Sequence, residues 1–270
     1  AYYQLVFALA DNVEQVDEKV AQLVRLGSDC QRRSMRFKDF SEQGLGGAEQ
    51  VSLYHFAFDT DPTISLRFWP PSLEDSQETQ ASILRGLDLM ARTSPTLRAE
   101  FDTLVHEIIL AAPSAGAREW RFDGASSYML WGALALSVDE RQSDLQRMET
   151  LAHECAHSLL FGFSIDEPLV LNDDSDRYSS PLRQDPRPMD GIYHATYVSA
   201  RMHYAMSSAL NSGLLDAAQQ AEAQARMATS EQAFFSGFSV VEAHADLSPT
   251  GQAVMEAAVA YMRRSFRPSF

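Results

Sequence analysis

The stretch LAHECAHSLL, residues 151–160, limits how this chain can fold more than any other feature. It places His153, Glu154 and His157 in the pattern H-E-x-x-H, in which two histidines bind a single metal ion. The pattern works only on a helix, because there residues four apart lie one turn from each other and point the same way. Glu154 is turned by about 100° from His153 around the helix axis, so it would flank the metal. From this position it can ligate the metal or handle a proton as a catalytic residue.

The sequence around the pattern supports that helix. Ser143 followed by Gln146 is a capping signature, and apolar residues then recur at helical spacing, which predicts a helix over 143–161. The stretch SSYMLWGALALSV, residues 126–138, is typical of a buried or edge strand. A strand next to a ligand-bearing helix lets an extended peptide lie beside the metal by strand addition.

Periodicity and turn residues predict the remaining elements. They are an N-terminal helix ending at Gly27, a hairpin over Val51–Pro70 with its turn at Asp59–Pro62, helices over 74–93 and 95–111 with Ser94 and Pro95 opening the second, an acidic loop over 164–190, and helices from about Gly191 onward with Ser248-Pro249 capping the last. The predicted class is α+β, predominantly helical, with a small sheet packed beside the H-E-x-x-H metal helix. We expect a single domain over 1–270, in which 1–120 is open to substrate recognition and 121–270 is the metal-binding catalytic part.

Composition excludes some classes of function. The formal net charge of -15 disfavours nucleic acid as a partner, because such a surface repels phosphates. Apolar runs are too short to predict a membrane-spanning helix. The only cysteines are Cys30 and Cys155, too few for a disulfide framework, which favours a reducing cytoplasm. The oligomeric state does not follow from the sequence.

A third metal ligand has to come from elsewhere in the chain. The long peptidase pattern H-E-x-x-H-x-x-G-x-x-H fails, since Leu160 and Phe163 occupy its glycine and last histidine positions. A glutamate on a following helix is also missing, because Glu167 falls in the loop and the next glutamate is Glu222. The nearest candidate is His194, whose alternative is a packed side chain between two tyrosines. Such a ligand set suits either zinc hydrolysis or oxygen activation at iron(II).

The run RYSSPLRQDPRPMDGIYHATY, residues 177–197, favours His194 as a ligand. Together with the H-E-x-x-H pattern it resembles the HExxH-motif peptide-modification family, in which an Asp-Pro-Arg-Pro loop precedes a Gly-x-x-His helix. The matching residues are His153, Glu154, His157, Pro181, Arg183, Asp185, Pro186, Arg187, Pro188, Gly191, His194 and Tyr197. Leu182 departs from the family pattern, which has an aromatic residue there. The resemblance is confined to this region, and residues 1–120 carry no motif of the family.

The resemblance implies an iron(II)- and 2-oxoglutarate-dependent dioxygenase that hydroxylates a side-chain β-carbon in a ribosomally synthesised precursor peptide, using O2. It implies His153, His157 and His194 as iron ligands. A cation must then hold the far carboxylate of 2-oxoglutarate, and arginine does this best through its planar fork. Our order of preference is Arg187, Arg183 and Arg201, and each has a structural ion pair as its alternative.

Three residues on the strand before the metal helix are candidate contacts to substrate or cosubstrate, namely Ser126, Ser127 and Tyr128. Two other functions stay open. One is a zinc metallopeptidase in which Glu154 acts as general base on a metal-bound water. The other is a non-catalytic module that binds a leader peptide, with the histidines holding a structural metal or none.

Overall fold

The structure is a computed structural model that describes residues 35–59, 68–113, 122–138, 141–180 and 185–265. Residues Phe37–Phe270 form one compact unit and Ala1–Arg36 form another. The elements below belong mainly to the unit Phe37–Phe270. The single domain expected over 1–270 stays a prediction, and the helix expected to end at Gly27 lies outside the described residues.

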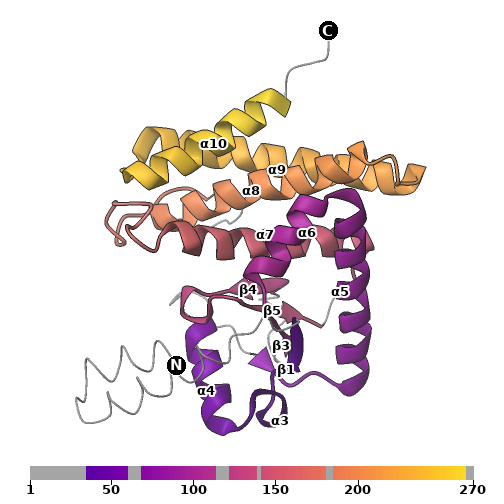
Figure 1. Cartoon of the computed structure of the whole chain (residues 1–270). Helices are drawn as coiled ribbons and strands as arrows, with labels where there is room; N and C mark the ends of the chain where they lie inside the picture. Colours follow the sequence, from indigo (N-terminus) through magenta and orange to yellow (C-terminus); the bar gives the residue numbers. More distant parts are fainter. Residues whose placement is uncertain (1–34, 60–67, 114–121, 139–140, 181–184, 266–270) are drawn as a thin grey trace, which may run out of the picture. The chain divides into compact units, whose positions relative to one another are not determined.

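Helices make up most of the described chain, and a small sheet accompanies them (Figure 1). The helices are α3 (Glu42–Leu45), α4 (Ala48–Phe58), α5 (Leu73–Thr93), α6 (Pro95–Leu104), α7 (Asp144–Phe163), α8 (Met189–Asn211), α9 (Ala217–His244) and α10 (Pro249–Ser265). The strands are β1 (Arg36–Asp39), β2 (Phe68–Trp69), β3 (Glu107–Pro113), β4 (Gly124–Ser126) and β5 (Ala133–Ser137), and a 3-10 helix, η2, covers Tyr128–Leu130. The predicted α+β class is therefore confirmed.

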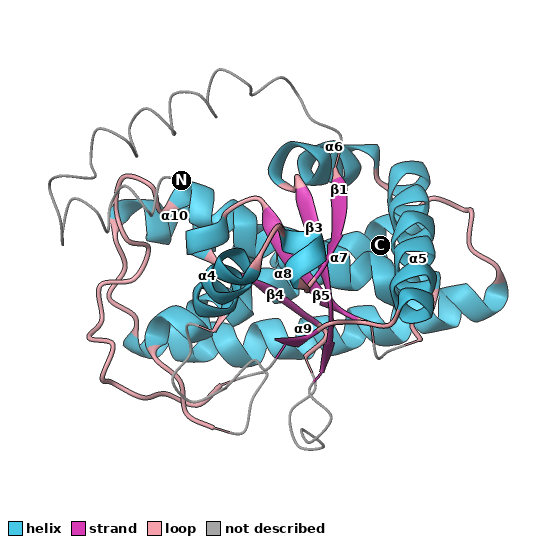
Figure 2. Ribbon diagram, turned by 90° about the horizontal axis from the view of Figure 1, so that it is seen from below, coloured by secondary structure: helices cyan, strands magenta, loops and turns pink. Residues whose placement is uncertain are grey.

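The sheet has the strand order β1-β3-β5-β4, with β2 pairing to β3 (Figure 2). Strands β3 and β5 are parallel, whereas β4 runs antiparallel to β5 with Ala125 opposite Ala135. Both central strands are buried, as continuous apolar runs in parallel strands usually are. Within the described residues β4 pairs with β5 alone, so it is an edge strand.

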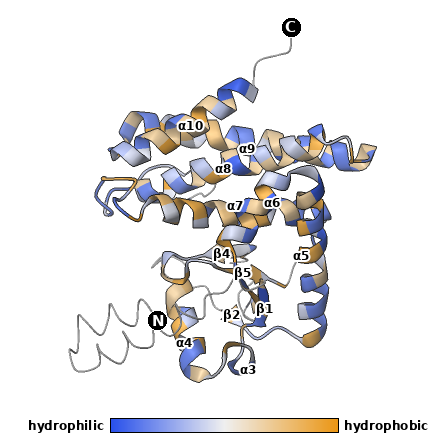
Figure 3. Ribbon diagram, viewed as in Figure 1, coloured by the Kyte–Doolittle hydropathy of each residue, from blue (hydrophilic) through white to orange (hydrophobic). Residues whose placement is uncertain are grey.

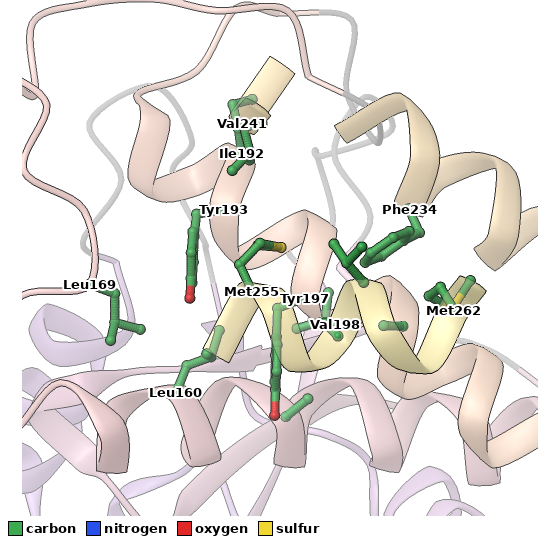
Figure 4. Close-up of a cluster of buried hydrophobic side chains, with 14 of the residues drawn as sticks. Leu160, Leu169, Ile192, Tyr193, Tyr197, Val198, Phe234, Val241, Met255 and Met262 are labelled. Carbon is green, nitrogen blue, oxygen red and sulfur yellow. The ribbon is translucent and has the colours of Figure 1, made fainter. Parts of the chain in front are cut away.

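Helix α7 contacts the sheet through β4 and contacts the other helices through α5 and α8 (Figure 1). Its other side joins a core shared with α8, α9 and α10, where large buried side chains interlock (Figure 4). In that core Leu160 of α7 and Tyr193 of α8 are fully buried, and the Tyr193 hydroxyl donates to the Gly251 carbonyl at 2.7 Å. Helix α7, which carries the predicted ligands His153 and His157, is thus packed against other elements on two sides.

Side-chain capping explains where helices α7 and α10 begin. The Ser143 hydroxyl accepts the Gln146 N–H at 3.0 Å, which confirms the predicted start of α7. Ser248 does the same for α10, accepting the Gly251 N–H at 3.0 Å. Helix α8 begins at Met189 with Pro188 as its N-cap, slightly before the expected start at Gly191.

The first strand of the hairpin predicted over Val51–Pro70 is wrong, and residues 60–67, with most of the predicted turn at Asp59–Pro62, lie outside the described residues. Tyr54, Phe56 and Phe58 lie on helix α4, where Phe58 is buried and Phe56 is 58% exposed. Their alternation suggested a strand, but Val51, Tyr54 and Phe58 also fit helical spacing, and this is the face that packs on the core. Phe68 does lie in a strand, β2, which pairs with β3.

The helix predicted over 95–111 is too long. It ends at Leu104, and Glu107–Pro113 form strand β3. The run Ile108–Leu110 is completely buried in the sheet, and such a short apolar run fits a buried strand as well as a helix. Pro95 is at the helix start as predicted, although the Ser94 side chain makes no capping hydrogen bond.

The strand predicted over 126–138 is confirmed in part. It divides into the end of β4, the turn η2, and β5. Gly132 has a φ of 95°, a left-handed conformation that glycine adopts at little cost, and it lets the chain reverse before β5. The predicted loop from 164 and the predicted helix over 74–93 agree with the end of α7 and with α5.

Hydrophobic and hydrophilic residues are interspersed along the helices (Figure 3). Among the described residues, no helix combines the length and apolar character needed to cross a bilayer.

Candidate metal centre

Three histidines from two helices meet at the contact between α7 and α8. His153 and His157 lie one turn apart on α7, and their Nε2 atoms are 3.2 Å apart. His194 comes from the first turns of α8, and its Nδ1 lies 3.0 Å from the Nδ1 of His157. The rings of His157 and His194 are stacked at an interplanar angle of 19°. The structure therefore brings together the three residues that the sequence singled out as ligands.

The three histidines form a hydrogen-bonded row, in which His157 lies between His153 and His194. Met202 lies at the His153 end of this row and determines which ring nitrogens donate and which accept. The Sδ of Met202 on α8 lies 3.3 Å from the Nδ1 of His153. A thioether can only accept, so His153 Nδ1 carries the proton and its Nε2 accepts from His157. His157 Nδ1 then accepts from His194. Three neutral rings satisfy this row completely, and a neutral ring is the form that binds metal.

Burial keeps His153 and His157 neutral. It lowers the pKa of His153 to about 4 and holds the pKa of His157 well below its usual value, with the neighbouring histidines adding to the effect at His157. Part of the row still faces solvent, since the side chain of His153 is 27% exposed and that of His194 is 17% exposed.

The spacing of His153 and His157 fits a shared metal ion. Metal–nitrogen bonds of about 2.0–2.1 Å place neighbouring ligand atoms roughly 3 Å apart. The 3.2 Å between the two Nε2 atoms has this value. His194 faces the opposite nitrogen of His157, so it joins the same ion only if one of these two rings turns. Accordingly, no three His, Cys, Asp or Glu side chains among the described residues form a ready-made site for a metal ion.

Glu154 lies on the sheet side of α7, under strand β4. It is 4% exposed, its Oε1 is 3.8 Å from His153 Nε2, and no described group hydrogen-bonds to its Oε2. Gly124 of β4 provides the space, because a Cβ at that position would lie 2.6 Å from Glu154 Oε1. A buried carboxyl oxygen without a partner, beside two imidazoles, fits a metal-bound ligand or water that the side chain would contact.

The environment of Glu154 favours its protonated form. Burial raises its pKa to about 8, a hydrogen bond with Ser126 opposes this, and the Asp123 carboxylate adds to it. Ser126, predicted to contact substrate or cosubstrate, is therefore placed against Glu154. A carboxyl group with a pKa near neutrality can both accept and return a proton.

This pKa makes the stability of the metal-free protein depend on pH. Below about pH 6.5 the free energy of unfolding falls, since His153 and His157 stay neutral when folded and gain protons when unfolded. As pH rises from about 4.5 to 8 it also falls, because folded Glu154 retains a proton that the unfolded chain releases. Glu154→Gln should remove this fall, about 2 kcal/mol of it between pH 6.5 and 8, and should steepen the loss of stability that the histidines cause below pH 6.5.

Denaturant unfolding of both proteins across this pH range, with a chelator present, measures the difference. The other titrating groups, including buried Glu149 with its raised pKa, are common to both proteins and cancel. Parallel curves for the wild type and Glu154→Gln above pH 6.5 would contradict a buried, protonated Glu154.

The candidate arginines differ in their surroundings. Arg187 forms a backbone bridge with Tyr178, and its Nε pairs with Asp185 at 3.0 Å. Arg201 pairs with Glu100 of α6 and lies 5.6 Å from the ring centre of Tyr204. The structural ion pair that was the alternative for Arg201 is thus present. Arg183 lies outside the described residues.

The remaining candidates, Ser127 and Tyr128, lie at the turn after β4. Ser127 is buried, and its hydroxyl accepts the Met129 N–H at 3.2 Å, which caps η2. Tyr128 is 45% exposed and meets Phe161 of α7 edge-to-face at 5.8 Å. Contact of either residue with substrate stays a prediction.

Sequence reasoning missed Met202, Gly124 and Phe161. Met202 lies eight residues after His194, about two helical turns, so helical spacing places both on one face. Phe161 lies about one helical turn after His157 on α7, and its ring centre is 5.9 Å from that of His194. Gly124 had no such signal, because its role depends on the packing of β4 over α7.

No protein-family model matches the chain, and the search of curated proteins found no match either.

Proposed function

We propose that this chain is an iron(II)- and 2-oxoglutarate-dependent dioxygenase that hydroxylates a side-chain β-carbon of a ribosomally synthesised peptide. The observation that carries the proposal is the meeting of His153, His157 and His194 beside Glu154, at the point where an edge strand crosses the helix. The segment that delivers His194 also contains the Asp-Pro-Arg-Pro run of the family that the sequence resembles.

The three imidazoles would hold iron(II), and bound iron and 2-oxoglutarate together would supply oxygen activation. The protein's part is to position groups around that chemistry. Strand β4 is an edge strand within the described part of the chain, and an extended peptide can pair with such an edge. Glu154 lies directly under that strand and can move a proton at its Oε2. Met202 accepts from His153 Nδ1 and so directs the Nε2 of that ring toward the ion.

Arg187 is the residue we assign to the far carboxylate of 2-oxoglutarate. It precedes α8, the helix of His194, and its side chain is 14% exposed. Its guanidinium pairs with a carboxylate from its own loop, that of Asp185, and the 2-oxoglutarate carboxylate would take the place of that partner. Arg201 is less suitable because its partner, Glu100, belongs to another helix, so this ion pair also links α6 to α8.

Arg187→Met should raise the apparent KM for 2-oxoglutarate by roughly a hundredfold while leaving iron affinity within a few-fold, because two charge-assisted hydrogen bonds are lost. Steady-state kinetics and a metal titration measure the two quantities. Arg177→Met is the matched control, since Arg177 lies in the same loop and its Nη1 donates to the Asp174 and Asp176 carbonyls. Equal effects of both substitutions would contradict the assignment.

A zinc peptidase is the second candidate, favoured by the place of Glu154 between the histidines and the edge strand. Glu154 would then take the proton of a metal-bound water. The missing glutamate on a downstream helix counts against it.

Mass spectrometry of products separates the two functions. Precursor peptides encoded near the gene are incubated with iron(II), 2-oxoglutarate and isotopically labelled oxygen gas. The dioxygenase adds one labelled oxygen atom and leaves the chain intact. Chain cleavage that proceeds with zinc, without 2-oxoglutarate or O2, would overturn the proposal in favour of the peptidase.

A further inference from the structure

Two large aromatic side chains are exposed next to helix α7, which carries His153 and His157. Tyr128 and Trp131 are 45% and 47% exposed, and both belong to the turn that directly follows edge strand β4. Tyr128 is connected to the candidate metal centre by two ring contacts, because it contacts Phe161 and Phe161 contacts His194. Exposed aromatic residues of this size next to a reactive centre are typical of recognition surfaces.

Trp131 is held in a fixed orientation on helix α7. Its indole Nε1 donates to the Ser158 carbonyl at 2.9 Å. Its ring lies over Gly162, where an added Cβ would be 3.3 Å from the ring carbon Cζ2. The polar edge of the indole is thus satisfied by the protein, and nearly half of the side chain still faces solvent. A fixed, half-exposed ring binds an apolar group at little cost in conformational entropy.

We propose that Tyr128 and Trp131 form an aromatic platform that binds a large apolar or aromatic side chain of the peptide substrate, close to the residue that is modified. Naming the peptide substrate as the occupant of this platform rests on the proposed function. A peptide is the occupant that fits because the turn carrying the platform directly follows β4, an edge strand among the described residues, and an edge strand can pair with an extended chain.

The geometry also predicts where the recognised residue lies in the peptide. Gly124 and Ser126 of β4 are the positions that contact Glu154. The platform begins two residues beyond Ser126. An extended chain rises about 3.3 Å per residue, so the apolar residue lies roughly two to four positions from the modified one.

Selection from a displayed library of random short linear peptides tests the platform without relying on catalysis. The wild-type protein should enrich peptides with Phe, Tyr, Trp or Leu at one position. Isolated enriched peptides should bind Tyr128→Ala and Trp131→Ala roughly tenfold more weakly. Trp69→Ala is the matched control, because Trp69 is 56% exposed on β2, which pairs with β3 and not with β4.

Gly162→Ala keeps both aromatic side chains but displaces the Trp131 ring, because the added Cβ would lie 3.3 Å from its Cζ2. The affinity for the same peptides should therefore fall several-fold. Melting temperatures close to the wild-type value show that the variants are folded. The proposal is overturned if the wild type enriches no apolar position, or if all variants bind the enriched peptides equally. It is also overturned if the protein is an oligomer that dissociates in Trp131→Ala, because the surface then joins copies of the chain. Enrichment of apolar positions together with chain cleavage in the product assay with precursor peptides would leave the platform standing and reject the proposed dioxygenase chemistry.

Discussion

Replacing His157 with alanine is expected to abolish metal binding and to reduce product formation by roughly a thousandfold or more. The reason is its central place in the row, since Nε2 faces His153 and Nδ1 faces His194. Removing this ring takes away one ligand, and His153 and His194 each lose the histidine that they contact. Metal content after dialysis against iron(II) or zinc, followed by a product assay, measures both effects.

His106→Ala is the control for that experiment. His106 is also followed by a glutamate, Glu107, but the chain continues into strand β3 instead of a helix. It is exposed and lies outside the metal centre, so its loss should leave metal content unchanged. Undiminished metal binding by His157→Ala would contradict the assignment of this centre.

Gly124→Ala should have the second largest effect, lowering product formation by roughly a hundredfold with iron still bound. The new Cβ would lie 2.6 Å from Glu154 Oε1 and 2.8 Å from its Cγ, which is closer than real Cβ contacts come. Either the buried carboxyl group or strand β4 must move, and both position the reaction. A loss of stability of about 1–3 kcal/mol should accompany the change.

Gly191→Ala is the matched control, because the Cβ added there meets the Arg187 Cβ at 3.6 Å, an ordinary contact. Product formation, iron content and denaturant unfolding are compared for both variants. If Gly124→Ala retained full activity, Glu154 would not depend on the close approach of β4, and its role in the reaction would be in doubt.

The sequence predicted the metal helix well because its determinants are local. Ser143, Gln146 and the spacing of His153 and His157 lie within a few turns of one helix, where periodicity fixes direction. The sequence offered His194 as the nearest further candidate, but only the resemblance favoured it as a ligand over a packed side chain, since its partners are distant along the chain. The structure nevertheless places it beside His157.

Other features could not be predicted because they depend on packing. The aromatic residues of α4 fit a strand or a helix equally well, and the contacts of Phe58 with Phe68 and of Tyr54 with Glu107 decided for the helix. The partner of Arg201 is Glu100, which lies far away in sequence on α6. The place of Gly124 above Glu154 likewise appears only when β4 packs on α7.

The most direct test of the account is an anaerobic titration of metal-free protein, first with iron(II) and then with 2-oxoglutarate, followed by visible absorption. The account predicts a weak charge-transfer band that needs both additions and is absent in His194→Ala, because the keto acid chelates iron held by the three histidines. Tight zinc binding with no such band in the wild type would contradict it and would favour the peptidase.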